Sequence, residues 1–91
     1  MLVTLSEMKQ YLRVDTDSED SLIENIIQTA EGICRDVARL DEESFAEQSA
    51  VTRMAVLYAA AYLYEHREEA DHRQLALTLR SLLFGVRKEG F

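Results

Sequence analysis

The side chains in this sequence that are best suited to metal binding or catalysis are two histidines, one cysteine and several neighbouring acidic residues. His66 and His72 lie among acidic residues between positions 65 and 71, a composition that suggests a metal site. Their spacing matches neither a zinc finger nor the H-E-x-x-H pattern, in which two imidazoles one helical turn apart face one ion. We therefore expect no metal ion there and interpret the segment as a solvated helix end.

The single cysteine, Cys34, continues an apolar stripe at helical intervals from Ile27 and Ala30. A catalytic thiol needs a base and an electropositive setting, and the neighbouring sequence identifies neither. A lone cysteine also excludes an internal disulfide and a multi-cysteine metal site. The pattern predicts that Cys34 is a core residue.

The acidic run Asp41, Glu42 and Glu43 is the clearest group of adjacent carboxylates. General acid catalysis needs an apolar pocket that raises the pKa of one carboxyl above that of its partner, and the sequence indicates no such pocket at this run. The sequence also contains no phosphate-binding loop and no dinucleotide fingerprint. We expect no enzyme activity and no cofactor.

The tripeptide Asp20-Ser21-Leu22 resembles the helix start of acyl carrier proteins, in which the serine bears phosphopantetheine. Carrier proteins have a long first helix and an extended loop before that serine, whereas one short helix and a brief linker precede Ser21 here. The alternative is ordinary helix-start chemistry, with Asp20 near the positive end of the helix dipole. The carrier function is the least favoured of the functions considered.

The chain has 91 residues, which is enough for one hydrophobic core, and we expect a single domain over residues 1–91. Its formal charge of -7 has the wrong sign for binding the phosphates of a nucleic acid, and its arginines are dispersed among acidic residues. The apolar run at residues 59–64 is far too short to span a bilayer. These features predict a soluble, intracellular protein at synthesis that is not a nucleic-acid reader.

The elements that must position these residues are helices, because the chain has no proline and only 3 glycines. A capping box, Thr4 with Glu7, begins a short helix that ends near Leu12 and turns Leu5, Met8, Tyr11 and Leu12 inward. A linker follows, and Asp17 or Ser18 is expected to cap a second helix over about residues 19–39. Its buried stripe comprises Leu22, Ile23, Ile26, Ile27, Ala30, Ile33, Cys34 and Val37. The fold class is all-α, a small bundle of four main helices.

A third helix, over about residues 47–67, is apolar nearly all round, so its pattern does not single out one buried face. One face carries Val51, Met54, Ala55, Tyr58 and Tyr62; the other carries Val56, Leu57, Ala60, Leu63 and Tyr64. Such a helix is either the central element of the domain or buries its second face against another subunit. We expect self-association through the second of these faces, at Val56, Ala60, Leu63 and Tyr64.

A fourth helix, over about residues 73–84, turns four leucines inward before Gly85 supplies a C-cap: Leu75, Leu79, Leu82 and Leu83. Leu77 and Phe84 are two turns apart on the far side. With Val86 and Phe91 of the tail, they are expected to dock a neighbouring protein or the next subunit. The alternative is that the tail folds back over them.

The order of these elements resembles the head-tail connector family of tailed phages and prophages. Four stretches carry the likeness: VTLSEMKQYLRVD at 3–15, DSLIENIIQTA at 20–30, AAYLYEHRE at 60–68 and SLLFGVR at 81–87. Each is a degenerate amphipathic pattern, but their order and spacing together are more specific.

The resemblance implies a structural virion protein of the neck, present in the host cytoplasm during assembly. It implies a homo-oligomeric ring beneath the portal protein that also contacts a downstream head-closure or tail protein, with DNA only as passing cargo and no membrane. The alternative function is that of a small helical regulatory or adaptor protein that binds one partner protein and forms no ring.

Overall fold

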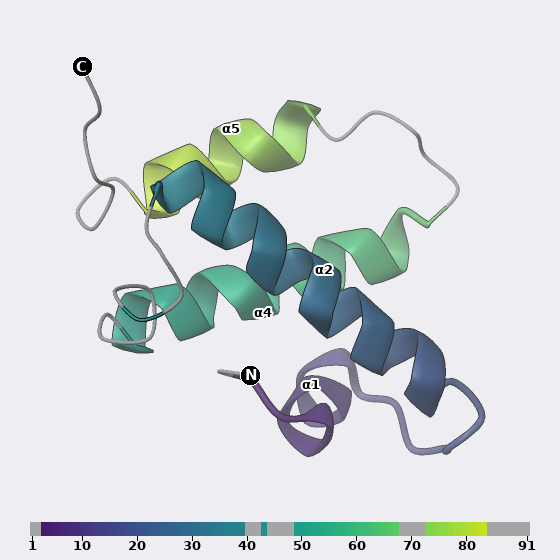
Figure 1. The fold of residues 1–91 in the computed structure, drawn as a ribbon. Helices are drawn as coiled ribbons and strands as arrows, with labels where there is room; N and C mark the ends of the chain where they lie inside the picture. Colours follow the sequence, from purple (N-terminus) through teal and green to yellow (C-terminus); the bar gives the residue numbers. More distant parts are fainter. Residues whose placement is uncertain (1–2, 40–42, 44–48, 68–72, 84–91) are drawn as a thin grey trace.

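The computed structural model describes residues 3–39, 43, 49–67 and 73–83, and these residues form four helices without a strand. Figure 1 shows their arrangement along the chain. The helices are α1 (Leu5–Leu12), α2 (Asp20–Ala38), α4 (Ser49–Glu65) and α5 (Arg73–Leu82). The prediction of an all-α bundle of four main helices is confirmed.

Helix α1 begins at the predicted capping box. The Glu7 backbone amide donates to Thr4 Oγ1 at 3.1 Å, and the Thr4 amide donates to the Glu7 carboxylate at 3.1 Å, so two amides without helical partners are satisfied at once. The helix ends at Arg13, whose left-handed backbone (φ 60) lets its amide donate to the Gln10 carbonyl at 3.2 Å. Met8 is fully buried, but the inward orientation predicted for Tyr11 is wrong, because 51% of this side chain is exposed.

The connection from α1 to α2 is held by Lys9, whose ammonium group lies 2.8 Å from carboxylate oxygens of both Asp17 and Asp20. Both contacts raise the pKa of Lys9, and the hydrogen bond between Lys9 and Asp17 lowers the pKa of Asp17. The prediction that Asp17 or Ser18 caps α2 is wrong, because Glu19 occupies the N-cap position and makes no side-chain cap bond. Asp17 does not cap the helix because its carboxylate is bound to the Lys9 ammonium group instead.

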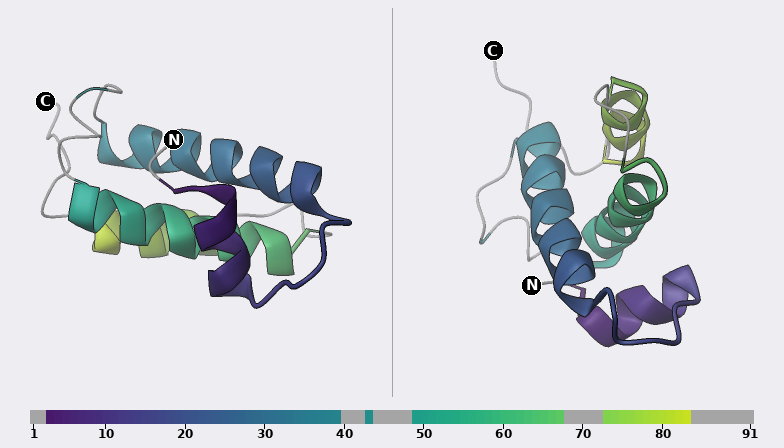
Figure 2. Two further views of the ribbon diagram at one scale, coloured as in Figure 1. Left: turned by 90° about the horizontal axis from the view of Figure 1, so that it is seen from below. Right: turned by 90° about the vertical axis from the view of Figure 1, so that its right-hand side faces the viewer.

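Helix α4 lies in the middle of the bundle and packs against α1, α2 and α5 (Figure 2). A central position was the first of the two alternatives for its all-round apolar sequence, and α2 shares this position, since it also packs against the other three described helices. Its most extensive contact is with α2. Small buried side chains let the neighbouring backbones approach closely, and α4 contributes four alanines: Ala55, Ala59, Ala60 and Ala61.

The core is completed by the predicted stripes of α2 and α5. Helix α2 buries Ile23, Ile26, Ile27, Ala30, Cys34 and Ala38, and α5 buries Leu75 and Leu79, with Leu83 following it. The ends of the α2 stripe are more open than predicted, since Leu22 is 37% exposed and Val37 is half-buried. On α5 the far-side position of Leu77 is confirmed, with 53% of its side chain exposed. The predicted Gly85 cap lies outside the described residues.

Polar contacts fix how the helices sit on one another. The Arg53 guanidinium contacts the Glu7 carboxylate and joins α4 to α1. The Tyr64 hydroxyl donates to the Glu19 carboxylate, which also lies 3.7 Å from the Arg67 guanidinium. The C-terminal end of α4 is thereby tied to the N-terminal end of α2.

Candidate interaction surfaces

Val56 and Ala60, which the sequence placed at a contact between subunits, are completely buried within the single chain. The idea that they are surplus to the protomer's own core is therefore wrong. The physical reason is that α4 packs against α1, α2 and α5, so its buried side chains belong to more than one face. No surface at these two side chains is left for a neighbour.

Leu63 and Tyr64, the other two predicted interface residues of α4, are half-buried and pack against the core. The Arg67 guanidinium carbon lies 4.7 Å from the centre of the Tyr64 ring, a cation–π contact. The hydrogen bond to Glu19 raises the pKa of the Tyr64 phenol. Tyr64 is thus engaged within the protomer, while Leu63 also lines an open groove.

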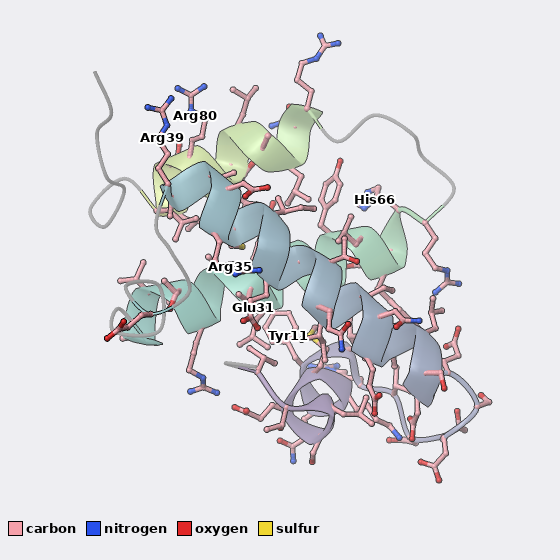
Figure 3. All side chains as sticks on the ribbon, in the orientation of Figure 1. Tyr11, Glu31, Arg35, Arg39, His66 and Arg80 are labelled. Carbon is pink, nitrogen blue, oxygen red and sulfur yellow. The ribbon has the colours of Figure 1, made fainter. Side chains whose placement is uncertain are left out.

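That groove lies between α2 and the C-terminal end of α4 and has a volume of about 300 Å³. Its lining combines apolar and polar side chains: Leu22, Asn25, Ile26, Thr29, Leu63, His66 and Arg67. His66 stacks on Tyr62, with ring centres 4.1 Å apart, and its Nδ1 lies 2.9 Å from the Tyr62 carbonyl oxygen. Figure 3 shows His66 at this end of α4. His66 is therefore half-buried beside the groove rather than on a fully solvated helix end.

The sequence reasoning missed an exposed apolar strip on α4 formed by Val51, Met54 and Tyr58. Their side chains are 39%, 62% and 37% exposed, although the sequence placed all three on the face expected to meet the core. One signal was available: Arg53 and Glu65 are the only charged residues of α4, so this helix has no polar face of the kind that normally turns to water.

Leu77 remains an exposed apolar side chain on α5, away from the core stripe. The other predicted docking residues, Phe84, Val86 and Phe91, lie outside the described residues. The dense acidic run at 41–43 is described only at Glu43, which is exposed.

Among the described residues, no group of three or more His, Cys, Asp or Glu side chains could hold a metal ion. His72 lies outside them. No helix in the described ranges combines the length and apolar character needed to cross a membrane.

Cys34 is fully buried, as predicted, and burial together with the charge of Glu31 raises the pKa of its thiol to about 12. Because the thiolate is the reactive form, the folded protein is expected to resist an aromatic disulfide reagent at pH 8 and to react in denaturant. Absorbance of the thiol that the reagent releases measures the rate of modification, and rapid modification of the native protein would contradict this prediction.

The same thiol makes stability depend on pH. Folding raises its pKa from the ordinary value of 9.0, so the free energy of unfolding is expected to fall as pH rises above that value.

The comparisons with known proteins identify one family. The model of the phage gp6-like head-tail connector protein family matches residues 2–89. No curated protein and no solved structure matches the chain. The match spans nearly the whole sequence, including all four helices described above, and the family is a structural one rather than a family of enzymes. The chain belongs to the phage gp6-like head-tail connector family.

Proposed function

We propose that this protein is a structural component of the virion neck, where it forms a homo-oligomeric ring beneath the portal and joins the DNA-filled head to the tail. The observation that carries the proposal is family membership over residues 2–89. The exposed strip of Val51, Met54 and Tyr58 supports self-association, since exposed apolar patches on small proteins commonly mark contact surfaces. The portal protein and a head-closure or tail protein are its proposed partners.

The charge of the chain supports a role at a DNA channel. Each subunit has a formal charge of -7, and a wall that bound phosphates strongly would retard translocating DNA. DNA is therefore proposed as cargo that passes the ring and not as a ligand. The protein would reside in the host cytoplasm until it is incorporated into the virion.

Native mass spectrometry over a range of protein concentrations, alone and with the purified portal protein, tests the proposal. We expect closed oligomers of one defined subunit number, formed alone or on the portal. A protein that stays monomeric under both conditions and binds no portal would overturn the ring and favour an adaptor that binds one partner.

Ring assembly is expected to strengthen as ionic strength rises. Subunits of charge -7 repel one another, and salt screens exposed charges separated by more than about 8–10 Å. Sedimentation velocity at low and high salt measures the assembled fraction. Weaker assembly at high salt would show instead that ion pairs between subunits outweigh the net repulsion.

The tail is proposed to dock a neighbouring neck protein or the next subunit together with Leu77. Truncation after Gly85 is then expected to abolish partner or ring binding with little change in melting temperature. A tail that folds back over its own chain predicts the opposite pattern, a lower melting temperature. Normal assembly and partner binding by the truncated chain would refute the docking role.

A further inference from the structure

The strip on α4 is an unusual surface for an exposed helix. Val51, Met54 and Tyr58 follow one another at intervals of three and four residues, so they form a continuous line along one side. Thr52 and Val56, on the opposite side of the same helix, are completely buried. The strip thus lies on the side of α4 away from these buried residues, and its three side chains are exposed.

The groove between α2 and the end of α4 is a second apolar surface, and it lies elsewhere on the chain. Leu22, which is 37% exposed, lines it together with Ile26 and Leu63. The strip occupies the first half of α4, on the side away from the core, whereas α2 supplies most of the groove. The two surfaces of one chain therefore cannot cover each other.

Residues of opposite charge lie at the two surfaces. Glu65, which is exposed, lies two helical turns beyond Tyr58 on the same side of α4 as the strip. Arg67, which is also exposed, lines the groove, and the Glu19 carboxylate of its own chain lies 3.7 Å from its guanidinium. Each surface thus combines apolar side chains with one exposed charged residue, Glu65 beside the strip and Arg67 in the groove. Asn25 and Thr29 at the groove edge offer partners for the Tyr58 hydroxyl.

A ring requires two different surfaces on each subunit, because a head-to-tail contact repeats around the circle, whereas a two-fold contact of one surface with itself stops at a dimer. We propose that the α4 strip of one subunit docks in the α2–α4 groove of a second copy of this chain. This inference rests on the proposed ring and specifies the contact that builds it. Apolar burial at the contact holds together subunits whose net charges repel.

Two variants and one control test this pairing. Met54→Glu places a charge on the strip, and Leu22→Glu places one in the lining of the groove; both positions are exposed in the single chain, so folding is expected to survive. Gln28→Glu adds the same charge at an exposed position of α2 that does not line the groove. Circular dichroism checks that all three variants keep their helical content.

We expect each of Met54→Glu and Leu22→Glu to be monomeric by native mass spectrometry, while Gln28→Glu assembles like the original chain. An equimolar mixture of the two defective variants is the decisive sample. It retains one intact groove and one intact strip on different chains, so it should form a one-to-one heterodimer and nothing larger.

The alternative outcomes separate the two proposals. If Leu22→Glu still assembles while Met54→Glu does not, the strip pairs with another surface and the proposed docking is wrong. If both variants assemble normally, neither surface forms the contact between subunits, although the proposal of a ring is unaffected. If the original chain never assembles, alone or on the portal, the proposed ring fails and this pairing fails with it.

Discussion

Replacement of Ala60 by Glu is expected to unfold the protomer. Ala60 is completely buried on helix α4, where a carboxylate would lose its contact with water. An uncompensated buried charge costs about 3–5 kcal/mol, and overfilling a packed core costs about 1–3 kcal/mol more. That sum is comparable with the total stability of a small domain, about 5–15 kcal/mol. Thermal unfolding followed by circular dichroism measures the loss.

Ala50→Glu is the matched control, because Ala50 lies on the same helix and is exposed. We expect this control to change the free energy of unfolding by no more than about 0.5 kcal/mol, as is usual for surface substitutions. A folded, stable Ala60→Glu protein that merely lost its oligomeric state would contradict the buried position of Ala60. It would restore the original idea that this face of α4 meets a neighbouring subunit.

Helix α4 shows when a sequence pattern does not identify the buried side of a helix. In α2 and α5, polar residues mark the outer side, so the periodic leucines and isoleucines identify the buried stripe. Helix α4 has only two charged residues, and either side could be read as the core side. The choice depends on where α1, α2 and α5 pack, which is a tertiary property that the local pattern does not contain.

The smaller errors also have tertiary causes. Asp17 has a good capping residue type, but Lys9 from the preceding helix binds its carboxylate. Tyr11 follows Met8 by three residues and so shares its side of the helix in the sequence pattern. Helix α1 nevertheless spans only Leu5–Leu12, and Met8 is its one completely buried residue. Leu5 and Leu12 also pack against the core, so the inner side of α1 follows Leu5, Met8 and Leu12 at intervals of three and four residues and leaves Tyr11 beside it.

The candidate surfaces were harder to predict than the helices. Leu77 was recognisable because it interrupts the polar side of an amphipathic helix. The groove combines Leu22 and Ile26 of α2 with Leu63 and Arg67 near the end of α4, residues that are about forty positions apart in the sequence. No local spacing links them, so only the packing of α2 on α4 brings them together.

Leu79→Ala is expected to detach or destabilise α5. Leu79 is completely buried and, with Leu75 and Leu83, holds this ten-residue helix against α2 and α4. Removal of a large buried side chain leaves a cavity and costs about 2–5 kcal/mol. An isolated helix of this length is marginal in water, so α5 has little stability without its packing.

Hydrogen exchange read by mass spectrometry distinguishes a local from a global effect of this substitution. If α5 is a separate unit of low stability, its amides lose protection in Leu79→Ala while those of α2 and α4 keep theirs; if the bundle is one cooperative unit, all three lose protection together. Leu77→Ala is the control on the same helix, and at 53% exposure it should change stability by about 0.5 kcal/mol or less. Equal loss of protection in the two variants would show that the packing side of α5 is not the one formed by Leu75 and Leu79. A partner-binding defect confined to Leu77→Ala would instead separate the outward role of this helix from its structural one, because the core contacts of α5 would be intact.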